Sequence, residues 1–365
     1  MLYKGLRLVA CAAALLSASV VFAEFGMDTL DLDVTSTNEV DSNVLYVDVL
    51  DTPSAMTPFA SRSLLNGITR AGKRLVTVGA RGHILYSDDE GKSWKQAKVP
   101  VSSDLTAVNF PTPEKGWAVG HDGVILHSSD RGENWIKQFD GNVALQVIAT
   151  RYKDAVDLAP EIDNLVKQGP DKPFLDVWFD NDRTGYVVGA FNFIFRTDNG
   201  GATWEPWLER TDNPKRLHLY AMRRIGDGLF IAGEQGLLLK FDPEQQKFGS
   251  LKCSYNGTFF GITGKPGVLV AFGLRGNAYR SLNGGASWQK IDTGVPTTLT
   301  GGTVTKDGRI VLATLLGTLL VSQDDGATFS PGSPQHGLPA SALTETESGS
   351  LALVGMRGVW APAAK

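Results

Sequence analysis

Three arginines occupy the same position in a repeated pattern, and their chemistry suits ligand recognition. Arg81, Arg275 and Arg357 each stand directly before a glycine in a short turn bounded by small residues. A planar guanidinium can pair with a carboxylate or a phosphate through two parallel hydrogen bonds. We therefore expect a cationic sector that binds an acidic group of a partner. The alternative is that the three side chains are ordinary solvated turn residues.

Residues for hydrolysis of a glycosidic bond are harder to find. A sialidase-like glycoside hydrolase, the alternative function that we consider, needs an arginine cluster, an acid, and a tyrosine activated by a glutamate. The Arg-Ile-Pro signature of such enzymes is missing from the chain, and Tyr220 and Asp176 are the nearest candidates for the acid and the nucleophile. We interpret both as pore-lining or packing residues. The sequence therefore predicts no enzyme and no catalytic residue.

Metal and cofactor sites are not expected either. The histidines are scattered without the paired spacing of metal ligands, and there is no phosphate-cradling loop or serine-nucleophile motif. Cys253 is the one cysteine outside the first 23 residues, so it has no intramolecular disulfide partner, and we interpret it as a buried, inert thiol.

The turns that carry the arginines belong to a repeat with a period of about 41 residues. Small residues bound each turn, as Gly79 and Gly82 do in the first unit, because a tight hairpin demands positive φ. Seven units align on the second glycine of the turn, and in the third unit an asparagine replaces it: Gly82, Gly123, Asn192, Gly236, Gly276, Gly317 and Gly358.

A polar loop that ends in an aromatic residue follows the turn in five of the units. The first loop reads Ser87-x-Asp89-x-Gly91-x-Ser93-Trp94, and this pattern resembles the Asp box, or BNR repeat. We expect the hydroxyl and acidic or amide residues to bond loop backbone, and the aromatic rings to pack between neighbouring units. A Ca²⁺-binding or catalytic role for the acids is the alternative. The structural box residues are Asp89, Trp94, Asp130, Trp135, Asn199, Trp204, Asn283, Trp288, Asp324 and Phe329.

Each unit contains four short apolar runs separated by turn signals, which predicts an all-β, seven-bladed β-propeller of four-stranded antiparallel blades over residues 44–365. In the second unit the runs are 105–110, 116–120, 123–128 and 135–139. The last unit ends after three runs. Residues 44–49 alternate like a strand, so we expect this N-terminal strand to complete the last blade and close the ring.

Antiparallel strands place the glycine-bounded turns and the blade connections on one face and the Asp boxes on the other. The predicted partner-binding residues on the first face are Arg81, Arg275, Arg357, His121 and Phe191. The same face receives an insertion over residues 141–172, between the second and third blades, where we expect a helix over 152–167 broken near Pro160. Long insertions of this kind are usually functional.

The N-terminal segment of the chain suggests export. Residues 1–23 have a basic start and an apolar run, as in a cleavable signal peptide, and residues 24–43 form an acidic lead-in that we expect to be mobile. The formal net charge of −4 becomes −6 without Lys4 and Arg7, so nucleic acid is not an expected partner. The periplasm is the expected location, or the thylakoid lumen in a photosynthetic host.

With the units laid out, the chain resembles the photosystem II stability and assembly factor family of exported BNR-type propellers. The resemblance covers roughly residues 45–360 and rests on the Val-Gly-x-x-Gly turns followed by Asp boxes. It implies a non-catalytic scaffold that binds a membrane protein or membrane protein complex and aids its assembly or stability. It also implies that arginines on one face, here Arg81, Arg275 and Arg357, form the docking patch. We expect a monomer.

Overall fold

A computed structural model describes residues 47–332 and 337–360 of the chain. The predictions of a signal peptide over residues 1–23 and an acidic lead-in over residues 24–43 lie outside the described residues. The fold that follows belongs to one compact unit, Val47–Lys365. Within the described residues, no helix has both the length and the apolar character needed to cross a membrane.

Seven antiparallel sheets follow one another along the described chain, and every sheet uses its strands in sequence order. This confirms the predicted propeller of seven blades. The blades are, in order, β1 (Leu65–Ala71), β2 (Arg74–Gly79), β3 (Ile84–Ser87) and β4 (Lys95–Gln96); β5 (Leu105–Asn109), β6 (Gly116–Gly120), β7 (Ile125–Ser128) and β8 (Ile136–Phe139); β9 (Phe174–Phe179), β10 (Gly185–Gly189), β11 (Ile194–Thr197) and β12 (Glu205–Pro206); β13 (Leu219–Ile225), β14 (Gly228–Gly233), β15 (Leu238–Asp242) and β16 (Lys247–Ser250); β17 (Phe259–Lys265), β18 (Val268–Gly273), β19 (Ala278–Ser281) and β20 (Gln289–Ile291); β21 (Leu299–Val304), β22 (Ile310–Thr314), β23 (Leu319–Ser322) and β24 (Ser330–Pro331); and β25 (Ala342–Glu345), β26 (Leu351–Gly355) and β27 (Gly358–Trp360).

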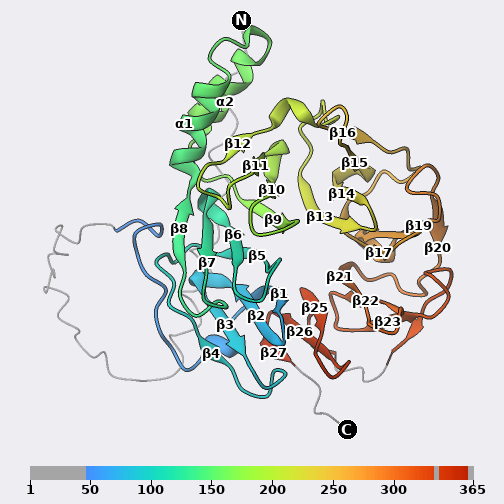
Figure 1. Ribbon diagram of the computed structural model, residues 1–365. Coiled ribbons are helices and arrows are strands. Elements are labelled where there is room, and N and C mark those ends of the chain that lie inside the picture. Colours follow the sequence, from blue (N-terminus) through green and yellow to red (C-terminus); the bar gives the residue numbers. More distant parts are fainter. Residues whose placement is uncertain (1–46, 333–336, 361–365) are drawn as a thin grey trace, which may run out of the picture. The chain divides into compact units, whose positions relative to one another are not determined.

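The blades form a closed ring in which the first strand of each blade lies next to the first strands of its neighbours (Figure 1). The join between the last and first blades is tight, because β25 and β26 pack against β1. Leu65 of β1, Leu85 of β3 and Val354 of β26 belong to one buried apolar cluster at this join. The second strands are buried along almost their whole length, since both faces of each sheet are covered by other blades.

The predicted N-terminal closing strand is not confirmed. Residues 44–46 lie outside the described residues, and Val47–Leu50 form no strand. The carbonyl of Val49 instead accepts a hydrogen bond of 2.8 Å from the backbone N–H of Ser102, in the connection between the first two blades. Leu50 joins the apolar cluster of those same blades. The start of the described chain therefore packs beside the first two blades, and the seventh blade has three strands among the described residues.

The insertion between β8 and β9 is helical, with bounds that differ from the prediction. It contains α1 (Gly141–Arg151), a 3₁₀ turn η4 (Val156–Leu158) and α2 (Ala159–Gln168), drawn beside β8 and β12 in Figure 1. Asp140 caps α1 by accepting hydrogen bonds from the backbone of residues 142 and 143, so the helix starts earlier than expected. Pro160 lies in the first turn of α2 and does not break it, because that position needs no N–H partner.

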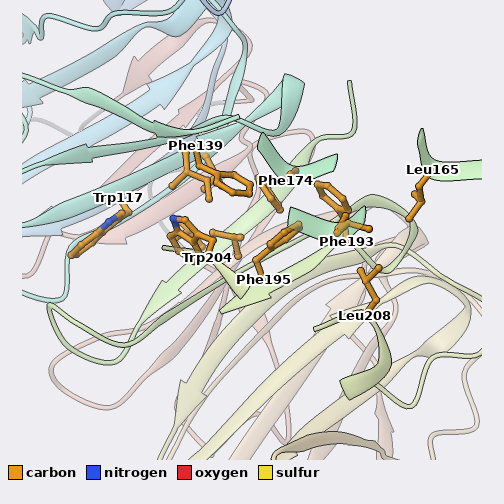
Figure 2. Close-up of a cluster of buried hydrophobic side chains, with 14 of the residues drawn as sticks. Trp117, Phe139, Leu165, Phe174, Phe193, Phe195, Trp204 and Leu208 are labelled. Carbon is orange, nitrogen blue, oxygen red and sulfur yellow. The ribbon is translucent and has the colours of Figure 1, made fainter. Parts of the chain in front are cut away.

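A large apolar cluster joins the insertion to the second and third blades. Figure 2 shows part of it, with Phe139, Phe174, Phe195 and Trp204 grouped together, and the rings of Phe139 and Phe195 lie 5.4 Å apart. Ile148 of α1 is buried in the same cluster. The insertion is thus an extension of the propeller core on one side of the ring.

Candidate functional site

The Asp-box loops satisfy their own polar groups. In the first box, the Ser87 hydroxyl accepts a hydrogen bond from the Gly91 N–H at 2.8 Å and donates to Asp89 at 2.8 Å. The Asp89 carboxylate also accepts from the backbone N–H and the hydroxyl of Ser93, and the bond from that hydroxyl leads the effects that lower the pKa of Asp89 to about 2. The indole N–H of Trp94 donates to the Gly91 carbonyl at 3.0 Å.

The other boxes repeat this geometry. The hydroxyl at the first box position bonds the acid or amide two residues later and the glycine N–H four residues later, in the boxes that begin at Ser128, Thr197, Ser281 and Ser322. Trp135 and Trp204 are buried, whereas Trp94, Trp288 and Phe329 are half-buried against their blades. No group of three or more metal-ligating side chains occurs among the described residues. The hydroxyl, acid and amide groups of the boxes thus bond within their own loops.

The opposite face, which we call the turn face, carries the turns between second and third strands. In the first blade this turn is a 3₁₀ turn, η2 (Ala80–Gly82), in which Arg81 and Gly82 have φ of 57° and 70°. The Arg81 backbone is fixed: its N–H donates to the Asp104 carboxylate at 2.7 Å, and its carbonyl accepts from the Ser54 hydroxyl at 2.9 Å. The Arg81 side chain is exposed.

The two turn glycines serve different needs, which corrects the expectation that both permit positive φ. Gly79 is extended, with φ of −172°, so its backbone is open to any residue. A Cβ there would lie 2.1 Å from the Leu64 carbonyl oxygen, so Gly79 is required by close approach to its own inner strand. Gly82 has positive φ, and its Cβ would also meet the Val101 carbonyl oxygen at 2.2 Å.

The turn face brings Arg81 and Arg357 to neighbouring blades and adds an arginine that the sequence analysis missed. The Ala80 N–H bonds the Leu64 carbonyl, and a Cβ on Gly358 would lie 1.9 Å from the Ser61 carbonyl oxygen. The segment 61–64 therefore runs between the two arginine turns, and it contains the exposed Arg62. The sequence signal that could have identified Arg62 is a basic residue just before the first inner strand.

Arg275 lies apart from this pair, in the 3₁₀ turn η8 (Leu274–Gly276) of the fifth blade, and it is also exposed. The turn of the sixth blade stands between them and carries Leu315 and Leu316, which are 45% and 59% exposed. The cationic sector is thus interrupted by apolar side chains. Other exposed apolar residues of the turn face are Leu64, Phe191, Leu274 and Met356.

Phe191 stands out among these turn residues. It lies in η5 (Ala190–Asn192) with φ of 54° and is 51% exposed. A bulky aromatic residue rarely adopts this left-handed conformation, so an exposed ring is held in a backbone conformation that disfavours it. His121, in η3 (His121–Gly123) of the second blade, is exposed on the same face.

A row of aromatic rings connects Phe191 to the centre of the ring of blades. The ring of Phe191 lies 4.5 Å from that of His218, which lies 6.1 Å from Tyr220, and Tyr220 lies 5.1 Å from Phe260. Tyr220 and Phe260 line a central cavity of about 190 Å³. The row of rings therefore runs from the turn face to the cavity wall.

The cavity is bounded by bulges in the inner strands, which the sequence analysis did not foresee. In six inner strands one residue is skipped in the pairing with the second strand, and that residue lines the cavity: Asn66, Thr106, Leu175, Tyr220, Phe260 and Thr300. An apolar residue stands before the bulge and, in five cases, glycine or alanine follows it. That short motif was the signal that could have located them.

Asp176 and Arg223 are the charged residues that line the cavity. The Asp176 carboxylate accepts from the guanidinium of Arg223, from the Met222 N–H at 2.7 Å, and from its neighbour's N–H. Burial raises the pKa of Asp176 in spite of these donors. Arg223 also donates to the Met222 carbonyl, and its side chain is 41% exposed.

The described residues do not assemble the constellation that a sialidase needs. Arg81, Arg275 and Arg357 lie on turns, and Arg223 alone among arginines lines the cavity. Burial, and next the charge of Glu234, raise the pKa of Tyr220. The Glu234 carboxylate accepts the His218 backbone N–H at 2.8 Å. Tyr220 and Asp176 both line the cavity.

Comparison with known proteins agrees with this architecture. The family model of the photosynthesis system II assembly factor YCF48 matches residues 48–141 and 163–294. The chain belongs to this family. The YCF48 match stops at the start of α1 and resumes inside α2, so most of the helical insertion lies outside the part that this family model describes.

Individual YCF48 relatives are distant. Photosystem II assembly lipoprotein Ycf48 of Synechococcus sp. (strain CC9902) is 25% identical over 162 residues, which make up 42% of this chain and 47% of that protein. The chain thus matches about half the length of this curated relative.

Solved structures share the fold. A structure described as YCF48 bound to D1 peptide covers 85% of this chain and 96% of its own, with a TM-score of 0.64 and 14% identity. A streptogramin B lyase has the same TM-score at 13% identity, covering 82% of this chain and 93% of its own. At such low identities these likenesses show the fold alone, so function must be argued from the site.

Proposed function

We propose that this protein is an exported, non-catalytic scaffold that binds a membrane protein complex and aids its assembly or stability. The partner docks as a polypeptide segment on the turn face, against the arginines and the exposed apolar side chains. Membership of the YCF48 family supports a role in assembly. A relative whose structure holds a D1 peptide supports a membrane protein as the partner.

One observation carries the proposal: exposed apolar and cationic side chains gather on the turn face. Phe191, Leu316 and Met356 are each more than half exposed there, and Arg81 and Arg357 lie on neighbouring blades. Exposed apolar groups beside arginines are typical of protein interfaces. In the first Asp-box loop on the other face, the serine hydroxyl and the aspartate bond groups of their own loop.

Export follows from residues 1–23, whose basic start and apolar run are those of a signal peptide. The working location is the periplasm, or the thylakoid lumen if the host is photosynthetic. Either compartment places the turn face within reach of the parts of membrane proteins that emerge from the bilayer. The protein acts there as a monomer.

The test uses photo-crosslinking residues placed at single positions in the full chain, in the native host. A crosslinker at Leu316 on the turn face should capture the same membrane protein in repeated experiments, and one at Lys92 in the first Asp box should not. The pair Arg81→Ala and Arg357→Ala should lower the yield at least tenfold without lowering the melting temperature. Equal crosslinking from both faces, or an unchanged yield in the arginine variant, would refute docking on the turn face.

A second variant separates binding from folding. Phe191→Gly removes an exposed ring and relieves a left-handed backbone conformation, so it should weaken docking while leaving the fold equally or more stable. Gln235→Gly is the matched control, because Gln235 has φ of 51° at the equivalent turn position in the fourth blade. Loss of stability in Phe191→Gly alone would mean that Phe191 is a packing residue.

A further inference from the structure

The central cavity contains a cationic group whose hydrogen-bonding capacity is only partly used. Both N–H groups on Nη1 of Arg223 are occupied, by the Asp176 carboxylate and by the Met222 carbonyl. Nε and Nη2 have no partner among the residues that the structure describes. The Arg223 side chain lines the cavity, so it presents the edge with which a guanidinium grips a carboxylate through two parallel bonds.

Asp176 fixes the position of the Arg223 guanidinium. Its carboxylate is fixed by the backbone N–H groups of Val177 and Met222 as well as by Arg223, and it is fully buried. It therefore holds the guanidinium in one orientation, which lowers the entropy that a ligand must remove. Its negative charge also disfavours a ligand with two charges. The site thus selects a monoanion.

The opposite wall offers hydrogen-bond acceptors. In a ring of seven blades the fourth, with Arg223, faces the first and the seventh. Asn66 lies on the first blade, and Thr106 lies on the second blade beside it. One N–H of the Asn66 amide donates to the Leu105 carbonyl and the Thr106 hydroxyl donates to the Phe174 carbonyl, each at 2.8 Å. The Asn66 carbonyl oxygen and the lone pairs of the Thr106 hydroxyl are left as acceptors for a ligand hydroxyl.

Size limits the ligand further. The cavity of about 190 Å³ is somewhat larger than an apolar cavity of about 150 Å³ that holds benzene, so it admits about six non-hydrogen atoms. The rings of Tyr220 and Phe260, 5.1 Å apart, add an apolar part to the wall. A carboxylate and a hydroxyl separated by a short carbon chain fit these limits.

We propose that the central cavity binds a small hydroxycarboxylate, with its carboxylate on Arg223 and its hydroxyl donating to the wall formed by Asn66 and Thr106. This site is separate from the docking of a polypeptide on the turn face. The shared chemistry has a second possible source, since an acidic side chain of a docked partner also ends in a carboxylate. The experiment must distinguish the two.

Ligand-observed NMR titration of the purified chain tests the site with three probes. 3-Hydroxypropionate should bind, propionate should bind about 2-fold to 10-fold more weakly because it lacks the hydroxyl, and the uncharged 3-hydroxypropanamide should bind at least tenfold more weakly. Binding of the amide as tight as that of the acid, or no binding of the acid, overturns the proposal.

Variants locate the site. Arg223→Lys keeps a cation beside Asp176 but loses the two-pronged edge, so affinity for 3-hydroxypropionate should fall about tenfold at an unchanged melting temperature. If that variant is unstable, Thr106→Val keeps the side-chain shape and should weaken the advantage of 3-hydroxypropionate over propionate. Arg81→Ala should change neither value, so failure here and failure of the docking proposal are distinguishable.

One further experiment distinguishes a free small acid from an acidic side chain of a docked partner. A short peptide with blocked ends and a single glutamate should not compete with 3-hydroxypropionate, because its backbone cannot enter a cavity of this size. A peptide that binds through Arg223 while the free acid does not would assign the cavity to an acidic side chain of a polypeptide and overturn the small-molecule assignment.

Discussion

Closure of the ring can be tested with a single methyl group at Gly358. This glycine has φ of 90°, and a Cβ would lie 1.9 Å from the Ser61 carbonyl oxygen and 2.7 Å from the Arg62 Cα, across the join between the last and first blades. Gly358→Ala should cost about 1–2 kcal/mol for the left-handed backbone and about 1–3 kcal/mol more for overpacking. The free energy of unfolding, from urea titration of tryptophan fluorescence, should therefore fall by about 2–5 kcal/mol.

Two matched glycines separate the contributions. Gly294 has φ of 69° with nothing within 4 Å of its Cβ position, so Gly294→Ala should carry the backbone cost alone. Gly276 has φ of 71°, and its Cβ would lie 1.8 Å from the Val295 carbonyl oxygen inside the ring, so Gly276→Ala should carry both costs. If Gly358→Ala behaves like Gly276→Ala, the ring is closed at the join. If it behaves like Gly294→Ala, the tight join does not exist and the reasoning fails.

Three further predictions concern the boxes and the insertion. Trp135→Ala should cost about 3–5 kcal/mol of unfolding free energy, because Trp135 is buried, whereas Ile136→Ala, at a neighbour that is 60% exposed, should stay near wild type in the same urea assay. The pKa of Asp89 is about 2, below its unfolded value, so its stabilising contribution is present above about pH 4 and is lost as pH falls through about 2. Urea midpoints measured from pH 5 to pH 2.5 should therefore fall more steeply for wild type than for Asp89→Asn. Parallel curves for the two proteins would contradict this prediction. Tyr152→Phe should leave the Leu208 N–H without the phenol oxygen that it bonds at 3.1 Å. The free energy of unfolding should fall by about 1–3 kcal/mol, and proteolysis within residues 141–172 should become faster. Unchanged cleavage would show that Tyr152 does not anchor the insertion.

The strands could be predicted from the sequence because each needs only a short apolar run between turn signals. In the second blade the expected runs at 105–110, 116–120, 123–128 and 135–139 became β5, β6, β7 and β8 with ends shifted by at most two residues. The repeat supplied seven comparisons of the same pattern. Local chemistry and periodicity agreed, so the fold class followed.

The partners of the inner-strand bulges and the path of the first described residues could not be predicted, because they depend on contacts between distant segments. Asn66 is displaced from the strand pairing and bonds the Leu105 carbonyl of the next blade; the motif near residue 66 marks the bulge but not this partner. Within the run at 44–49, the described residues from Val47 form no strand, and the backbone contact of Val49 with Ser102 lies far away in the sequence. The early start of α1 was missed although Asp140 gives an N-cap signal, because no glutamate or glutamine follows to complete a capping box.

The candidate site was only partly within reach of the sequence. Topology alone placed Arg81, Arg275 and Arg357 on turns of one kind, and the structure has them there and exposed. Which turns are neighbours depends on the ring, and the contribution of Arg62 depends on the route of a segment that has no counterpart in the repeat. The pairing of Asp176 with Arg223 joins two blades through side chains, and single-sequence periodicity carries no information on such pairs.

Departures from the repeat indicate where function lies, because repetition reflects what the ring needs everywhere. The third and fourth blades depart in several ways: Asn192 replaces the turn glycine, the fourth blade has no Asp box, and the insertion enters before β9. The replacement of glycine is compensated locally, because the Asn192 side chain donates to the Leu208 carbonyl at 2.9 Å. The same sector contains Phe191, Tyr220 and Arg223. A ring that needed only stability would gain nothing from an exposed phenylalanine in a left-handed turn, so the third and fourth blades are where a partner and a ligand should be sought first.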